Sequence, residues 1–223
     1  MLQIKNLHFS YAKLDVLKDV NAHFEKGKIY GIVGPNGSGK TTLFNTLTGI
    51  LTPRKGELAF SERPSFGISF HSAGFDKNLT IAQTLQTVAI CKGVPQSEVD
   101  EAVSYWKLGR YRNKKLKQLS QGTVQKVSII SSLFQTTNFV LLDEPTNGLD
   151  VDSILDLRDY LQAKKAERTL LIASHTLTEL ERNTDSILFL RYGELSPPVS
   201  VKEIIDTHGS LEAKYLSLLN RTR

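Results

Sequence analysis

A glycine-rich stretch near the start of the chain carries the residue types that hold a phosphate chain. Residues 31–43 read GIVGPNGSGKTTL and contain the pattern G-x-x-x-x-G-K-[ST] at Gly34, Gly39, Lys40 and Thr41. Glycines allow backbone N–H groups to turn toward a phosphate chain. Lys40 can reach the outer phosphates, and Thr41 can place its hydroxyl on Mg²⁺.

The elements around this stretch decide between a phosphate loop and an ordinary glycine-rich turn. Residues 29–33 are a short apolar run, typical of a buried strand, and Leu43, Leu47 and Ile50 then recur at helical spacing. The motif requires this order of strand, loop and helix, and the positive end of the helix favours an anion. We therefore predict a nucleotide phosphate site at Gly34, Pro35, Asn36, Gly37, Ser38, Gly39, Lys40, Thr41 and Thr42.

A second apolar run ends in two acids. Residues 139–144 read FVLLDE. A carboxylate at a strand end, here Asp143, can hold Mg²⁺, and the next, Glu144, can orient or deprotonate a water that attacks a phosphoryl group. In isolation such a pair would more often solvate the end of a strand, but beside a phosphate loop we interpret it as functional, with Asp143 on the metal and Glu144 in catalysis.

The order of elements predicts an α/β protein with a mostly parallel sheet covered by helices. Residues 2–30 indicate an N-terminal β-subdomain, and strands alternate with helices after residue 122. The helical block near 79–120 interrupts this alternation, so we predict one domain over residues 1–223 with an inserted helical subdomain at about 76–126.

Composition narrows the class of protein further. The 223 residues include one cysteine, Cys91, which excludes a disulfide within the chain and suits a reducing compartment. No apolar run approaches the ~20 residues of a membrane helix, and the first residues do not resemble a signal peptide. We expect a soluble protein of the cytoplasm. The net charge of +5 is too small to argue for nucleic-acid binding.

Three further motifs follow in order: LSQGTVQK at 119–126, NGLD at 147–150 and LIASHTLTELE at 171–181. Together with the phosphate loop and the acidic strand, they resemble the ATP-binding-cassette (ABC) ATPases over essentially the whole chain. The resemblance implies the P-loop NTPase core of that family, with ATP and Mg²⁺ as cofactors.

The resemblance also assigns roles to individual residues. It implies that Tyr11 stacks on adenine, that Glu144 is the catalytic glutamate, and that His175 is the switch histidine. Ser120 and Gly122 belong to the signature, which serves the nucleotide of a second subunit. Each has a simpler alternative: a core aromatic for Tyr11, a helix cap for Ser120 and a structural imidazole for His175.

The chain departs from the family pattern at two places. His71 stands where the family has a glutamine that contacts Mg²⁺ and the attacking water, and an imidazole cannot copy the paired donor and acceptor of an amide. Either His71 takes that catalytic role with altered tuning or the local alignment slips. In the signature, Gln121 replaces a glycine and Thr123 replaces a glutamine.

The resemblance predicts an ATP-binding and ATP-hydrolysing subunit that powers a separate transmembrane permease, with features of exporters for drugs, peptides or polysaccharides. The expected partners are that permease and a second nucleotide-binding subunit, in a homodimer or a heterodimer, with no nucleic acid. We expect peripheral attachment to the cytoplasmic face of the cell membrane. The alternatives are a soluble ABC ATPase and a nucleotide-gated module with weak hydrolysis.

One basic segment lies outside these motifs. Residues 106–117 read WKLGRYRNKKLK. The segment is either a solvated helix face and loop or a surface near lipid head groups or a cytoplasmic helix of the partner.

Overall fold

The computed structural model describes residues 1–70 and 74–220, which belong to two compact units. Unit 1 combines both ends of the chain, Met1–Arg63 and Thr169–Arg223, and unit 2 is the middle, Pro64–Arg168. The single domain over residues 1–223 and the helical subdomain at about 76–126 stay predictions.

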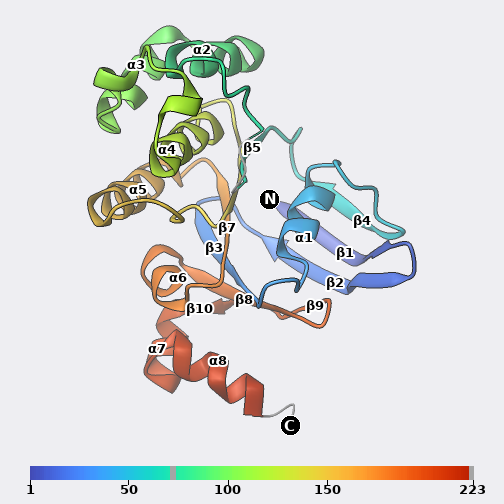
Figure 1. Ribbon diagram of the computed structural model, residues 1–223. Helices are drawn as coiled ribbons and strands as arrows, with labels where there is room; N and C mark the ends of the chain where they lie inside the picture. The colour runs from blue at the N-terminus through green and yellow to red at the C-terminus, as the bar shows by residue number, and fades with distance from the viewer. Residues whose placement is uncertain (71–73, 221–223) are drawn as a thin grey trace. The chain divides into compact units, whose positions relative to one another are not determined.

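Unit 1 begins with the predicted β-subdomain. Strands β1 (Leu2–Tyr11), β2 (Leu14–Phe24) and β4 (Lys55–Phe60) form an antiparallel sheet in the order β2-β1-β4 (Figure 1). Side chains alternate between the two faces of a strand, and in β1 the apolar ones, including Leu7 and Phe9, are buried.

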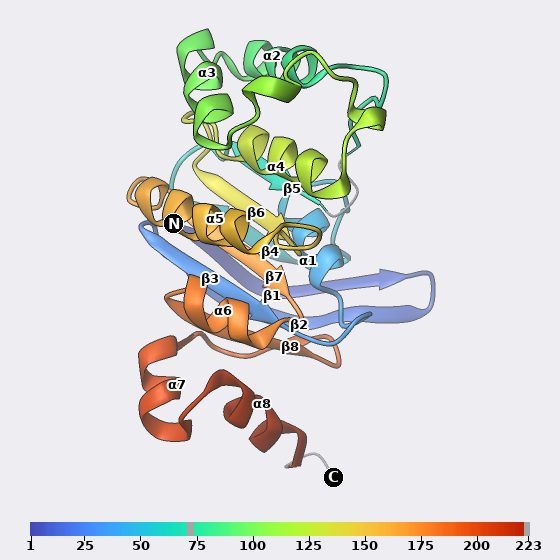
Figure 2. The same ribbon diagram turned by 60° about the vertical axis from the view of Figure 1, so that its left-hand side comes forward.

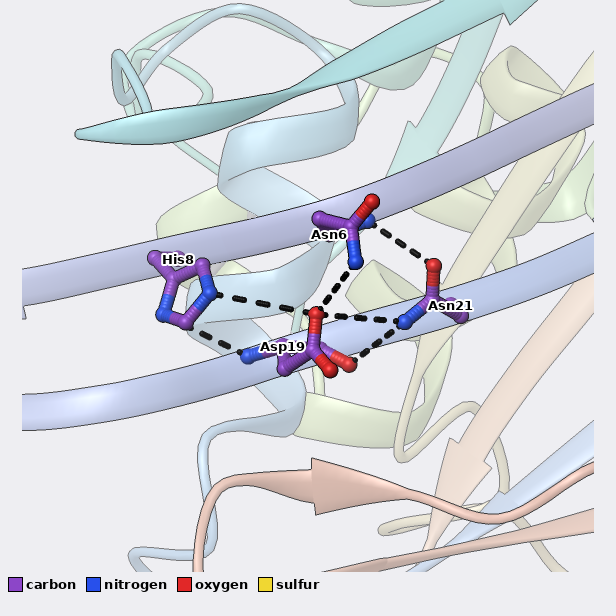
Figure 3. A network of polar contacts seen from close by, with 4 residues as sticks. All are labelled: Asn6, His8, Asp19 and Asn21. Carbon is purple, nitrogen blue, oxygen red and sulfur yellow. Dashed lines mark hydrogen bonds and ion pairs between the residues drawn. The ribbon is translucent and has the colours of Figure 1, made fainter.

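The pairing of β1 with β2 shifts register at several points, and a network of polar contacts stabilises the hairpin there (Figure 3). Asn6 and Asp19 have φ of 47° and 50°, the left-handed region that non-glycine residues rarely adopt. The Asn6 amide donates to Asp19 Oδ1 at 2.7 Å, and the Asn6 backbone N–H donates to Asn21 Oδ1 at 2.9 Å. His8 Nδ1 accepts from the Asp19 backbone N–H at 3.4 Å. These contacts fix the bulges in the hairpin that carries Tyr11 near its tip.

The remaining strands of unit 1 surround β3 (Lys28–Val33). Strands β7 (Thr169–Ser174) and β8 (Ser186–Arg191) pair with β3 in parallel, one on each side. In this register Val33 lies opposite Ser174. The carboxyl ends of β3 and β7 therefore share one edge, where ligands bind in open α/β sheets. The other elements here are α1 (Lys40–Leu47), α6 (Leu177–Asn183), β9 (Glu194–Leu195) and β10 (Val199–Ser200).

The end of the chain turns back after β8. Strand β8 stops at Arg191, because Tyr192 and Gly193 both have positive φ and turn the chain into β9. Helices α7 (Val201–His208) and α8 (Leu211–Asn220) follow. Figure 2 shows both helices at the C-terminal end of unit 1.

Unit 2 pairs two parallel strands, β5 (Phe66–Ser69) and β6 (Phe139–Asp143). A Cβ at Gly67 would lie 1.7 Å from the carbonyl oxygen of Ser132, so only glycine lets the end of α4 approach β5 so closely. The helices are α2 (Ile81–Lys92), α3 (Gln96–Tyr105), α4 (Gln121–Ser132) and α5 (Val151–Lys164), with 3-10 turns η1 (Gly109–Tyr111) and η2 (Leu116–Gln118). The predicted α/β class is confirmed.

Aromatic rings join α3 to α5 inside unit 2, and a buried cation lies against the end of α4. The ring centroids of Tyr105 and Trp106 lie 4.8 and 5.8 Å from that of Tyr160. Burial raises the pKa of Tyr160 to about 12, so the phenol stays neutral at physiological pH. The buried Arg168 donates to the carbonyl of Leu133 at 2.8 Å, and burial lowers its pKa.

Candidate functional site

The predicted phosphate loop lies between β3 and α1 in unit 1 (Figure 1). Its glycines are required by geometry. Gly37 and Gly39 have φ of 80° and 105°, and a Cβ at Gly34 would lie 2.5 Å from both the Leu190 carbonyl oxygen and Ser38 Oγ. Helix α1 starts after Gly39, which has no side chain that could cap it. The N–H groups of the first turn therefore face whatever lies at the loop.

Lys40 and Ser38 give the loop its polar side chains. Lys40 is only 7% exposed, and its Nζ donates to the carbonyl oxygens of Gly34 at 2.7 Å and Pro35 at 3.2 Å. Ser38 Oγ is buried and has no hydrogen-bond partner among the described residues. A buried hydroxyl without a partner is costly, and a phosphate oxygen would satisfy it. The loop therefore fits the predicted ligand.

A pocket of about 440 Å³ lies beside the loop in unit 1. The loop forms one wall, and β2, the turn after β8 and helix α8 form the others. Its lining residues are Leu14, Asp15, Val16, Lys18, Pro35, Asn36, Gly37, Ser38, Arg191, Tyr192, Gly193, Tyr215 and Leu219. Arg191 ties α8 to this wall by donating to the Leu218 carbonyl at 2.8 Å.

Two further predicted residues belong to unit 1. Tyr11 is 48% exposed and meets the Phe9 ring edge-on at 4.8 Å, so it is not the core aromatic of the simpler alternative. His175 is exposed and follows β7 directly. Because Val33 pairs with Ser174, His175 and Gly34 both follow strand ends at the same edge of the sheet.

The acidic pair belongs to unit 2. All five residues of β6 are buried, and Asp143 at its end is 7% exposed. Glu144 has φ of 50°. A non-glycine residue in the left-handed region is uncommon and is found preferentially at functional sites. The backbone thus turns sharply between two neighbouring carboxylates.

The signature residues lie at the start of α4, also in unit 2. Ser120 caps this helix: its hydroxyl accepts from the Thr123 backbone N–H at 3.3 Å and lies 2.9 Å from Thr123 Oγ1. A Cβ at Gly122 would lie 2.1 Å from the Gly148 carbonyl oxygen, which brings the signature against the NGLD stretch. Sequence reasoning assigned no individual role to Gly148, since a close approach between residues 26 positions apart has no local signal.

The structure thus brings Tyr11, the phosphate loop and His175 into one unit, and Ser120, Gly122, Asp143 and Glu144 into the other. His71, the third predicted catalytic residue, lies outside the described residues. The roles of all these residues stay predictions.

Comparisons with known proteins identify the class. A family model described as ABC transporter matches residues 17–147. The chain is 35% identical over 203 residues to the lantibiotic transport ATP-binding protein SrtF of Streptococcus pyogenes, covering 87% of this chain and 89% of that protein. The chain therefore belongs to the ABC transporter family, and it is an ATP-binding ATPase of that family.

Other relatives and solved structures agree. The bacitracin transport ATP-binding protein BcrA of Enterococcus faecalis is 31% identical over 217 residues, covering 92% of this chain and 70% of that protein. A solved ATP-binding subunit of an ABC transporter superposes with a TM-score of 0.88 at 25% identity, covering 98% of this chain and 99% of the other. The dimeric cassette MJ0796 superposes with a TM-score of 0.81 at 23% identity, covering 90% and 99%. The predicted ABC cassette fold is confirmed.

Within residues 1–70 and 74–220, none of the helices combines the length and the apolar character that crossing a bilayer requires.

Proposed function

We propose that this chain is the ATP-hydrolysing subunit of a transporter whose membrane-spanning part is a separate polypeptide, and that it works on the cytoplasmic face of the membrane. The observation that carries this proposal is the match to SrtF, a transport ATP-binding protein, over nearly the full length of both chains. Membership of the ABC transporter family supports the same assignment.

The proposed cargo is a peptide, moved outward. Two relatives are named for the transport of lantibiotics and of bacitracin, which are peptide antibiotics. The sequence features typical of exporters favour the same direction of transport.

In the proposed site, the loop binds the phosphates and Lys40 supplies the positive charge. Its ammonium, now held by two loop carbonyls, turns to the outer phosphates when ATP enters. The Ser38 hydroxyl and the first N–H groups of α1 add hydrogen bonds. Tyr11 offers its exposed ring to the adenine, a contact worth about 1–3 kcal/mol per base in nucleic-acid complexes.

Glu144 is proposed to act as general base on the water that attacks the terminal phosphate, while His175 donates to that phosphate or orients the water. Mg²⁺, which prefers oxygen ligands, would be held by Thr41 and Asp143 and would neutralise phosphate charge. Asp143 fits such a role because it places a carboxylate at the end of a fully buried strand, β6.

The proposal includes a second nucleotide-binding subunit, whose Ser120 and Gly122 contact the nucleotide held by the first. A solved cassette of this fold is described as dimeric, which supports a paired arrangement.

The proposal is tested by purification and by function. A tagged Glu144→Gln chain is used as bait in detergent-solubilised membranes of the cell that makes it, and we expect one multi-span membrane protein to co-purify. That protein and the wild-type chain are then expressed together in a bacitracin-sensitive bacterium. We expect the pair to raise the bacitracin concentration that stops growth, and a pair containing Lys40→Ala to leave it unchanged.

Two negative results have different meanings. Co-purification of a membrane protein without resistance to bacitracin would exclude bacitracin as the cargo but keep the transporter subunit. Recovery of ribosomes or DNA in place of a membrane protein would refute the transporter assignment itself.

A further inference from the structure

We propose that the basic segment, residues 106–117, is a binding surface for the anionic head groups of a phospholipid bilayer. This inference rests on the proposed function only for the claim that the chain works at a membrane.

The basic segment contains the whole net charge of the protein. It has six cationic residues and no acid: Lys107, Arg110, Arg112, Lys114, Lys115 and Lys117. The chain has a net charge of +5, so the other residues together have 5 − 6 = −1. Twelve consecutive residues therefore concentrate the electrostatic attraction that an anionic surface would experience.

The fold anchors the segment to unit 2 and leaves its charged side chains exposed. Trp106, Leu108 and Leu116 are buried, while all six cationic residues are exposed. Backbone hydrogen bonds tie the segment to the start of α2: the Ile81 N–H donates to the Lys114 carbonyl, and the Leu116 N–H donates to the Leu79 carbonyl. Figure 2 shows the segment between α3 and α4, beside α2. The cationic side chains are thus gathered before any ligand arrives.

Only two of the six cations have a carboxylate partner among the described residues. Arg112 pairs with Asp100 at 3.0 Å, and Lys107 pairs with Asp156 at 3.3 Å. Lys117 donates to the neutral amide oxygen of Asn78 at 3.0 Å. For Arg110, Lys114, Lys115 and Lys117 the described residues provide no ion pair, so these four charges remain available to an external anion.

The aromatic residue of the segment that is not buried, Tyr111, favours lipid over nucleic acid. The guanidinium of Arg110 lies 4.7 Å from the centroid of the Tyr111 ring, and Lys114 Nζ lies 5.3 Å from it. Single-stranded nucleic acids bind by stacking bases on open aromatic faces, and these two cations already occupy the ring of Tyr111. Lipid head groups require only clustered positive charge, and each Lys or Arg near an anionic leaflet raises binding about fivefold.

The test is co-sedimentation of the full chain with vesicles. The vesicles are phosphatidylcholine alone or phosphatidylcholine mixed with phosphatidylglycerol, at low and high salt. The test variant replaces the four cations without ion pairs: Arg110→Gln, Lys114→Gln, Lys115→Gln and Lys117→Gln. The control replaces four exposed lysines of unit 1: Lys5→Gln, Lys13→Gln, Lys55→Gln and Lys202→Gln. Each has a net charge of 5 − 4 = +1, so they differ only in where charge is lost.

We expect wild type to bind the phosphatidylglycerol vesicles and not the neutral ones, with binding lost in high salt. The test variant should bind at least about tenfold more weakly, and the control variant within about twofold of wild type. Far-UV circular dichroism and ATP affinity should be unchanged in both, since exposed substitutions alter stability little.

Three outcomes would overturn the inference. The first is equal binding to neutral and anionic vesicles. The second is an equal loss in both variants, which would mean that net charge alone matters. The third is no vesicle binding together with weaker capture of the membrane partner by the test variant, which would assign the segment to an acidic surface of the permease. None of these outcomes bears on whether the chain powers that permease.

Discussion

Helices α1 and α4 both begin at a predicted nucleotide contact, but their first turns are built differently. Helix α1 in unit 1 starts after Gly39, so its N–H groups have no capping side chain from that position. Helix α4 in unit 2 starts at Ser120, whose hydroxyl already accepts from the Thr123 N–H. The first is therefore open to an anion, while the second must give up a cap contact to bind one.

This difference suggests a division of labour between the two units. The phosphate loop should supply most of the affinity for ATP, because the uncapped N–H groups of α1 already face the site before ATP arrives. The acids and the signature should contribute mainly to hydrolysis and to the pairing of chains. The four predictions below test this division, from the largest expected effect to the smallest.

Replacing Glu144 should lower turnover and spare the affinity for ATP. Glu144→Gln removes the general base, and such a group contributes about 10²–10⁴ in rate. We expect phosphate release to fall by that factor, with the affinity for ATP unchanged. Trapped ATP should also convert the variant from monomer to dimer on size-exclusion chromatography, because a ligand that bridges two chains adds its binding free energy to the dimer.

Two companion variants sharpen this result. Adding Ser120→Arg should block the dimer while sparing ATP binding to the monomer, because a bulky cation would occupy the phosphate position. The exposed Glu57→Gln in β4 should leave turnover unchanged. A Glu144→Gln protein that stays monomeric in saturating ATP would count against a homodimer and favour a different partner chain.

Replacing Lys40 should affect binding. A hydrogen bond to a charged group contributes about 1.5–3 kcal/mol, so we expect Lys40→Ala to weaken ATP binding at least about 10- to 150-fold in calorimetry. Lys55→Ala, which removes an exposed lysine of the same unit, is the matched control. Unchanged affinity in Lys40→Ala would refute the assignment of the phosphate loop.

Replacing Gly122 should show that the signature contributes to hydrolysis while the phosphate loop supplies the affinity for ATP. An alanine there would place its Cβ 2.1 Å from the Gly148 carbonyl, and overpacking of this kind costs about 1–3 kcal/mol. We expect Gly122→Ala to unfold at lower denaturant and to hydrolyse ATP more slowly, with ATP affinity retained. Gly109→Ala is the control, because open space surrounds a Cβ at that glycine. An equal free energy of unfolding for Gly122→Ala and Gly109→Ala would contradict the close approach of Gly122 to the Gly148 carbonyl.

The smallest effect concerns Asp150, which caps α5 next to the signature. Its carboxylate accepts from the Ser153 backbone N–H at 2.8 Å and from the Ser153 hydroxyl, and these bonds lower the pKa of Asp150. The stabilisation is therefore complete above the unfolded pKa of about 3.9 and is lost as pH falls through the lower folded value.

Asp150→Ala should cost about 0.5–2 kcal/mol at neutral pH. The difference in free energy of unfolding between wild type and Asp150→Ala should narrow as the solution is acidified below pH ~4. Chemical denaturation at a series of pH values measures this difference. If this difference in free energy of unfolding stayed constant into strong acid, the ionised carboxylate of Asp150 would not be what stabilises the start of α5.

The local patterns of the sequence predicted much of this protein. The phosphate loop is one contiguous stretch, and its glycines, its apolar strand and its helical spacing are all visible within residues 29–50. The buried strand at 139–143 and the helical block near 79–120 were also predicted, because apolar periodicity directly reflects burial. The family resemblance then supplied roles for Tyr11 and His175 that their local sequence alone could not.

Only the tertiary structure decided which of these stretches approach one another. The pairing of Val33 with Ser174 puts His175 and Gly34 at the same edge of the sheet, although the two paired residues are 141 positions apart in the sequence. The contact of Gly122 with Gly148, the buried hydroxyl of Ser38 and the turn at Tyr192 depend likewise on partners remote in sequence or on a backbone angle. Periodicity reports whether a side chain is buried, but not what it is buried against, and that information exists only once the chain has folded.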